Sequence, residues 1–323
     1  MATQQRGDGS FPTDRTGQPA ITSLAILAFA SSGHFPGEGK YGVPLQRGVE
    51  YVLDQARPNG SICLTPSTND NAAYNHAISG LMLCEIYGMA KPNAAKRISE
   101  VIERAVAFTL KDQRRPKRNP RDEGAWRYLP NHPVESHDPQ SDLSVTSWQL
   151  MFLRSAKNAG FEVDITSVDM ARRYVVKLYN ERTHTFNYAH EYRAKDFTTR
   201  GMTGAGILSL SLGGMHDTEM ARSAADWLLE HSFDRYNRGS NDNDVYHYGA
   251  YYCSHAMFQV GGEHWQRFFP PLFKTLVANQ RPQGNWALER AVPSHARYGE
   301  NYTTAFAVLA LTVPWQLLPA FQR

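Results

Sequence analysis

Two kinds of apolar pattern alternate along the chain. In residues 96–112, Ile98, Val101, Ile102 and Ala105 fall on one side of a helix and charged residues fall opposite them, which predicts an amphipathic helix. The same pattern recurs in residues 45–56, 166–180, 217–232 and 263–279. The segments between these helices are apolar or small on most sides, which predicts helices buried all round. They cover residues 20–32, 72–89, 143–159, 199–212, 246–260 and 302–313.

The alternation predicts an all-α fold, because the chain lacks the alternating Val, Ile and Thr that strands require. One amphipathic and one buried helix recur about every 45–60 residues, which is typical of stacked helical hairpins. Six buried helices enclosed by amphipathic ones predict an (α/α)6 toroid of inner and outer helices. No linker or change in composition divides the chain, so we expect residues 1–323 to form one domain.

A short phrase follows the outer helices: a Gln, then a Gly, then an apolar residue two positions after the Gly. The glycine suits a turn with positive φ, and the apolar side chain can fold back onto the helices. The copies are Gln5–Gly9–Phe11, Gln55–Gly60–Ile62, Gln113–Gly124–Trp126 and Gln280–Gly284–Trp286, with a degenerate copy in residues 180–186.

The first copy begins only four residues after the start of the sequence, where no helix precedes it. We therefore expect the toroid to lack its first outer helix and the natural protein to extend upstream of Met1. No signal peptide follows Met1. The sequence thus leaves the location open: cytoplasmic as it is written, exported if a signal peptide has been removed.

Composition narrows the classes of partner. The 34 basic and 31 acidic residues give a formal net charge of +3, which does not indicate nucleic acid. The basic run in residues 111–118 is interrupted by proline and is interpreted as a solvated loop, with contact to an anionic membrane surface as the alternative. No apolar run is long enough for a transmembrane helix. Three cysteines without a CxxC pair indicate neither a disulfide framework nor a thiolate zinc site.

Several stretches resemble a known family. Residues 47–62, which include Arg47, Gly48, Tyr51 and Gln55, are similar to the repeat of squalene–hopene cyclases, and the copy ending at Trp286 keeps the tryptophan of that repeat. Residues 251–265 and 302–319 resemble the short bacterial proteins with prenyltransferase/squalene-oxidase repeats. The resemblance implies a toroid with an apolar or isoprenoid ligand in a central cavity, onto which the N-terminal ends of the inner helices converge.

Asp142 is the first candidate catalytic residue. The resemblance places the acidic DxDDT motif of class II terpene cyclases just before the third inner helix, but only Asp142 is present there. A single carboxylate is ordinarily ionised at neutral pH and protonates an alkene poorly. The motif is therefore not retained, and Asp142 is also expected to act as the N-cap of its helix.

His247 is the second candidate. The stretch Asp244-Val-Tyr246-His247 resembles the part of protein prenyltransferase β subunits in which the histidine binds zinc. Those enzymes also need an Asp-x-Cys pair one hairpin earlier, and residues 196–202 contain no cysteine. No metal or other cofactor is predicted, and zinc at His247 is kept only as an alternative.

His76 is the third candidate and supports a different class of function. Asn71, Tyr74 and His76 cluster at the start of the second inner helix. Asn can neutralise a uronate carboxylate while Tyr or His moves protons, so a uronate lyase is one alternative. A glycoside hydrolase that draws its acid/base pair from Glu123, Asp138 and Asp142 is another alternative with a polysaccharide substrate. A non-catalytic binding or scaffold protein is the third reading.

Aromatic residues at inner-helix positions are the predicted ligand-binding residues, because aromatic faces bind apolar groups and stabilise cations. Arg200, at the start of the fourth inner helix, is also predicted to bind the ligand, through an anionic group. The expected partner is a small molecule or a glycan, and the oligomeric state is left open. The aromatic set is Tyr74, Trp148, Tyr246, Tyr248, Tyr251 and Tyr302.

Overall fold

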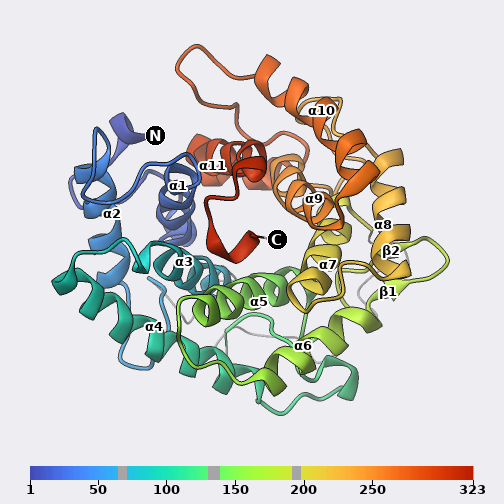
Figure 1. Ribbon diagram of the computed structural model, residues 1–323, viewed down its shortest axis with the longest axis horizontal. Coiled ribbons are helices and arrows are strands. Elements are labelled where there is room, and N and C mark those ends of the chain that lie inside the picture. Colours follow the sequence, from blue (N-terminus) through green and yellow to red (C-terminus); the bar gives the residue numbers. More distant parts are fainter. Residues whose placement is uncertain (65–70, 130–138, 191–197, 323) are drawn as a thin grey trace.

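The helices form two concentric rings in the computed structural model, which describes residues 1–64, 71–129, 139–190 and 198–322 (Figure 1). The inner ring contains α1 (Ala20–Ala30), α3 (Ala72–Tyr87), α5 (Leu143–Asn158), α7 (Arg200–Leu212), α9 (Tyr246–Val260) and α11 (Gly299–Leu311). The outer ring contains α2 (Gly42–Asp54), α4 (Pro92–Gln113), α6 (Ile165–Lys177), α8 (Glu219–Glu230) and α10 (Gly262–Ala278). The predicted all-α toroid is confirmed.

Short elements connect the helices. A hairpin pairs β1 (Tyr179–Asn180) with β2 (Thr185–Phe186) in antiparallel register. The 3₁₀ turns are η1 (Ala2–Gln4), η2 (Arg15–Gly17), η3 (Pro120–Asp122), η4 (Pro293–Tyr298), η5 (Val313–Trp315) and η6 (Pro319–Phe321).

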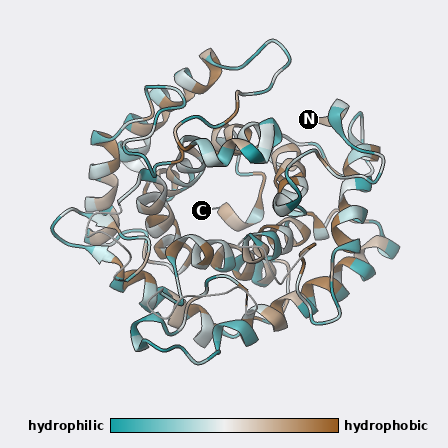
Figure 2. Ribbon diagram, turned by 180° about the vertical axis from the view of Figure 1, so that it is seen from behind, coloured by the Kyte–Doolittle hydropathy of each residue, from teal (hydrophilic) through white to brown (hydrophobic). Residues whose placement is uncertain are grey.

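Each inner helix packs against its two neighbours, and α11 closes the ring against α1. Inner helices bury nearly every residue, whereas outer helices bury one stripe, and Figure 2 shows the outer helices hydrophilic on their outward side. Helices α7 and α9 pack closely, since a Cβ on Gly204 would lie 2.9 Å from the backbone nitrogen of Cys253. Small residues therefore set the spacing of the ring on this side.

The repeated phrase forms the same turn in several places. The Gln113 amide donates to the Gly124 carbonyl at 2.7 Å, and the Gln280 amide donates to the Gly284 carbonyl at 3.0 Å. The Gln55 amide instead donates to its own helix, to the Tyr51 carbonyl. In the degenerate copy the glycine position holds His184, which still adopts a φ of 55°. The apolar residue that ends each copy is buried: Phe11, Ile62, Trp126, Phe186 and Trp286.

The turns also join one hairpin to the next outer helix. A Cβ on Gly60 would collide with the carbonyl oxygen of Arg104 in α4, and one on Gly9 would collide with that of Arg47 in α2. Around Gly284, by contrast, the nearest atom would be its own turn's Gln280 amide nitrogen, 3.9 Å away. The outer ring of the described residues is open there, between α10 and α2, as expected for a toroid without its first outer helix (Figure 1).

The C-terminal segment, residues 312–322, folds into the centre of the ring at the end where the inner helices finish (Figure 1). The Ala320 backbone nitrogen donates to Glu85 on α3 at 3.1 Å, and the Phe321 ring lies 4.2 Å from the ring of His255 on α9. Burial raises the pKa of Glu85 to about 7, although hydrogen bonds from Ser155 and Ala320 oppose this. The segment closes one end of the toroid over a carboxyl group with few partners.

We predict that Gly60→Ala destabilises the protein by about 2 kcal/mol or more, since it adds both an unfavourable positive φ of 92° and a backbone collision. Gly284→Ala is the matched control, because its φ of 83° is similar but no backbone atom stands in the way. Its loss should be only about 1 kcal/mol. Urea unfolding of the two variants measures the difference, and equal losses would contradict the role assigned to the Arg104 contact.

We predict that the protonated Glu85 carboxyl stabilises the folded protein and that this stabilisation is lost as the pH rises. The folded-state pKa, about 7, lies above the unfolded one, so the native state holds the extra proton between about pH 4.5 and 7. The stabilising contribution is complete below about pH 4.5 and is lost as the pH rises to about 7, by an amount on the order of 3 kcal/mol. Glu85→Gln should remove this loss. Unfolding of both proteins from pH 4.5 to 8 checks it, and parallel pH profiles would show that Glu85 titrates normally.

Candidate central cavity

The first turns of all six inner helices surround a central cavity of about 370 Å³. A volume of this size suits a drug-sized ligand. Its wall is rich in aromatic side chains, and Arg297 is the only Asp, Glu, Lys or Arg among the described residues that line it. The aromatic lining residues are Tyr74, Tyr128, Trp148, Tyr188, Tyr248, Tyr298, Tyr302 and Phe306.

A chain of hydroxyl groups crosses the cavity wall. Tyr74 donates to Ser144 at 3.0 Å, and the Ser144 and Tyr248 hydroxyls are 2.7 Å apart. Burial raises the pKa of Tyr74 well above its ordinary value and that of Tyr248 to about 12. These phenols therefore keep their protons at neutral pH and are suited to hydrogen bonding rather than to acting as bases.

A polar cluster stands on the side of the cavity formed by η4 and the start of α3. The Arg297 guanidinium donates to the Tyr298 hydroxyl at 2.8 Å, and the Asn71 amide donates to the same oxygen at 2.9 Å. His295 contacts the Tyr302 hydroxyl through Nδ1 at 3.2 Å. Burial lowers the pKa of His295 to about 4, so its imidazole is neutral at physiological pH. We call Asn71, His295, Arg297 and Tyr298 the rim cluster.

The sequence reasoning missed His295, Arg297 and Tyr298 because it began the sixth inner helix at Tyr302. The helix starts at Gly299, and η4 carries the preceding residues to the cavity. The stretch of His, Arg and Tyr directly before an inner helix was the available signal.

Four predicted ligand-binding residues line the cavity: Tyr74, Trp148, Tyr248 and Tyr302. Their participation in binding stays a prediction. Tyr251 lies behind this wall and stacks on Trp148, with the ring centroids 5.4 Å apart. It supports the wall instead of forming it.

Asp142 does not line the cavity. Its carboxylate is fully buried and accepts a hydrogen bond from the Val145 backbone at 2.8 Å, so it is an N-cap of α5, as expected. Burial raises its pKa to about 6, and the charge of Arg127 opposes this rise. The expectation that this carboxylate faces the ligand is wrong, because the helix end needs it as an acceptor.

His76 also lies outside the cavity lining. Its Nδ1 accepts from the Ile62 backbone at 3.2 Å, and its Nε2 is 2.8 Å from the Thr109 hydroxyl. Burial lowers its pKa to about 3. The histidine connects α3 to the second repeat turn, and the placement predicted for it in the cavity is wrong.

His247 and Tyr246 turn away from the cavity as well. Buried Glu289 lies 2.7 Å from His247 Nδ1 and also accepts from the backbone nitrogens of both residues at the start of α9. The Tyr246 hydroxyl donates to the Phe233 carbonyl at 3.3 Å. Here too the predicted cavity position is wrong, because Glu289 draws both residues into the end of the helix.

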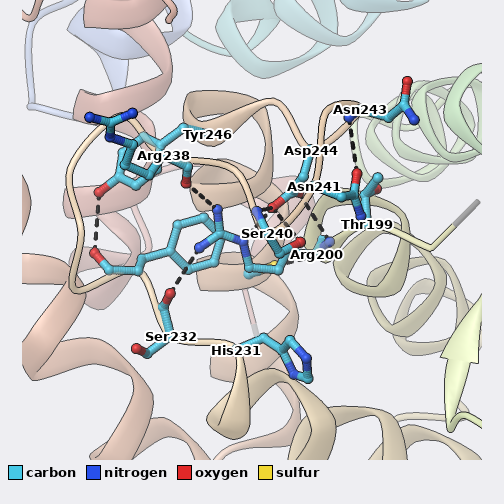
Figure 3. A network of polar contacts seen from close by, with 12 residues as sticks. Thr199, Arg200, His231, Ser232, Arg238, Ser240, Asn241, Asn243, Asp244 and Tyr246 are labelled. Atoms are coloured by element: carbon cyan, nitrogen blue, oxygen red, sulfur yellow. Dashed lines mark hydrogen bonds and ion pairs between the residues drawn. The ribbon is translucent and has the colours of Figure 1, made fainter. Parts of the chain in front are cut away.

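Arg200 is buried in a network that leaves its guanidinium no face toward a ligand (Figure 3). Nε donates to Asp244 at 2.6 Å, and the two terminal nitrogens donate to the Ser232 and Arg238 carbonyls at 2.8 and 2.7 Å. The guanidinium also lies 3.9 Å from the centre of the Phe233 ring. Arg200 therefore does not line the cavity, contrary to its expected place beside the ligand. Arg200 instead holds residues 238–245, which bring Asn243 and Val245 to the cavity.

Other predicted chemistry finds little support in the described part of the chain. It contains no group of three or more His, Cys, Asp and Glu that could hold a metal ion. Glu123 is exposed and does not line the cavity. Asp138, the other candidate acid for glycoside hydrolysis, lies outside the described residues. Among the described residues, no helix has the length and apolar character needed to cross a membrane.

Comparison with known proteins shows which solved structures share this fold. No protein-family model matches the sequence, and a search of curated proteins finds no relative. The solved structures that match include a type II terpene cyclase, MstE from Scytonema, in complex with geranylgeranyl dihydroxybenzoate. The alignment has a TM-score of 0.63 and 13% identity, and it covers 98% of this chain and 94% of that one. The chain shares the α/α-toroid fold of this terpene cyclase.

The toroid is shared with proteins of other activities. Protein geranylgeranyltransferase-I of Candida albicans, complexed with GGPP, aligns with a TM-score of 0.58 and 13% identity over 97% of this chain and 91% of that one. An α-1,6-mannanase of Salegentibacter, in complex with α-1,6-mannotriose, aligns with a TM-score of 0.61 and 11% identity over 96% and 95%. At such identities the likeness establishes the fold alone.

We predict that Arg200→Met destabilises the protein by about 3–5 kcal/mol, because it leaves Asp244 buried without its cation. Arg222→Met is the matched control: the Arg222–Asp217 pair is exposed, and its loss should change stability by less than about 1 kcal/mol. Chemical denaturation compares the two. A small effect at both positions would mean that Arg200 does not hold residues 238–245.

Proposed function

We propose that the toroid binds an amphipathic small molecule and holds its apolar body, isoprenoid or similar, in the central cavity. The observation that carries this proposal is the wall itself: aromatic rings and aliphatic side chains converge there, and no carboxylate lines it among the described residues. Aromatic and aliphatic surfaces with a few placed polar groups are typical of small-molecule sites.

The same wall disfavours the catalytic alternatives. Alkene protonation needs a carboxylic acid at the substrate, and the nearby acid, Asp142, is an N-cap outside the lining. Glycoside hydrolysis needs two carboxylates about 5–9.5 Å apart on either side of the bond. The described lining offers neither arrangement, so we propose binding and assign no reaction.

The structural neighbours are compatible with the proposal without deciding it. The terpene cyclase and the geranylgeranyltransferase are each described with a geranylgeranyl compound, whereas the mannanase is described with a mannotriose. The aromatic wall of this chain favours a ligand of the first kind, since the described lining lacks the carboxylates of glycosidases.

We predict that Ile78→Trp weakens the binding of farnesol, an uncharged isoprenoid alcohol, by at least about tenfold. Ile78 lines the cavity, and an indole ring there removes space that the ligand requires. Ile78→Leu is the matched control, because it conserves volume and should retain binding. Isothermal titration calorimetry measures both variants, and thermal denaturation verifies that each is folded.

Native mass spectrometry of the protein purified from its own host provides an independent test. Recovery of an apolar or isoprenoid compound supports the proposal. Recovery of an uronic oligosaccharide, or equal farnesol binding by the wild-type protein and Ile78→Trp, would overturn it.

A further inference from the structure

We propose that the rim cluster is a subsite for the carboxylate head group of the ligand. This inference rests on the proposed function, because it orients the ligand with its acid at the rim and its apolar body toward Trp148 and Phe306. Arg297 and the Asn71 amide both donate to the Tyr298 hydroxyl, at 2.8 and 2.9 Å. The Tyr298 hydroxyl in turn donates to Asn71 Oδ1 at 3.1 Å, so these three side chains form one hydrogen-bonded cluster at the cavity wall.

The charge of the wall selects an anion. Arg297 is the one formally charged residue at neutral pH among the described residues that line the cavity. The six inner helices also direct their N-terminal ends, which carry partial positive charge, toward the same space. The guanidinium can bind both oxygens of a carboxylate at once.

The acidic residue Asp14 also lies within the influence of Arg297. Its pKa is lowered, chiefly by hydrogen bonds from Thr16 and to a smaller degree by the charge of Arg297. The Asp14 carboxylate accepts from the Thr16 backbone at 2.8 Å and from its hydroxyl at 2.6 Å. Asp14 does not line the cavity, so the described lining contains Arg297 and no carboxylate.

The hydrogen-bond partners of the Asn71 side chain are the second observation that supports the subsite. Asn71 is at the N-cap of α3, where asparagine is among the best capping residues, yet its side chain makes no capping bond. Asp142 and Thr199, at the N-caps of α5 and α7, do cap their helices. The Asn71 amide instead contacts Tyr298 and the Thr16 hydroxyl, which directs it to the rim. A capping residue has thus been turned toward the cavity.

The neutral members of the cluster complete the subsite. His295 is held through Nδ1 by the Tyr302 hydroxyl, and Tyr298 is nearly fully buried beside it. Beyond them the lining becomes apolar, with Ile21, Leu24 and Phe306. This order of polar rim and apolar interior fits a carboxylic acid that carries a hydrocarbon chain.

The experiment compares three probes by isothermal titration calorimetry at pH 7.5: farnesoic acid, farnesol and galacturonic acid. The first two share an apolar body, and the third carries a carboxylate without one. We expect the wild-type protein to bind farnesoate about tenfold more tightly than farnesol, the usual gain from a charge-assisted hydrogen bond.

Substitutions in the rim cluster test whether this cluster causes the preference for farnesoate. Arg297→Gln should abolish the preference for farnesoate over farnesol, and Asn71→Ala should reduce this preference. Arg290→Gln is the matched control, since Arg290 is an exposed arginine on the preceding loop that does not line the cavity. Arg297→Lys keeps the charge and should retain part of the preference.

The outcomes separate the two proposals. Equal affinity for farnesoate and farnesol, or a preference that survives Arg297→Gln, would overturn the carboxylate subsite and leave the proposed function intact. Absence of binding by both isoprenoid probes would overturn the proposed function. Galacturonate binding that disappears in Arg297→Gln would then still support the subsite, for a ligand with a polar body.

Discussion

All six inner helices begin at the same end of the toroid, and their first backbone N–H groups need acceptors inside a largely apolar ring. A buried donor without a partner costs about 1–3 kcal/mol. The chain meets this constraint with side chains from different elements. Asp142 and Thr199 cap their own helices, Asn75 accepts from the Ala20 backbone at the start of α1, and Glu289 serves α9.

This requirement explains why so many polar residues near the cavity are structural. Asp142, His247 and Arg200 stand where a catalytic group would be sought, but each is bound into the support of a helix or loop. The cavity wall is consequently left to aromatic side chains, and the Tyr74 and Tyr248 hydroxyls both bond to the Ser144 hydroxyl that lies between them. A wall of this kind binds and orients a molecule more readily than it transfers protons to or from it.

The two ends of the toroid differ. At the end where the inner helices finish, the C-terminal segment packs into the ring, and Phe321 and His255 lie beneath the aromatic layer of Tyr251 and Trp148. At the other end the cavity is bordered by loops and η4, with Arg297 exposed. Under the proposed function, the ligand would lie between the rim cluster and this packed floor, which favours binding in one orientation.

The sequence alone determined the helices, their inner or outer character and the turns that join them, because apolar periodicity and the need for glycine at positive φ are local properties. It also identified four aromatic lining residues, since an aromatic side chain on an inner helix lies either in the cavity wall or in the packing behind it, as Tyr246 and Tyr251 do. Only the tertiary structure decided which polar side chains face the ligand. That choice depends on acceptors supplied from far along the chain, as Glu289 supplies Tyr246 and His247, and as Tyr298 meets Asn71 across the ring. Pairing of this kind leaves no trace in the spacing of residues, because it arises only when the ring closes.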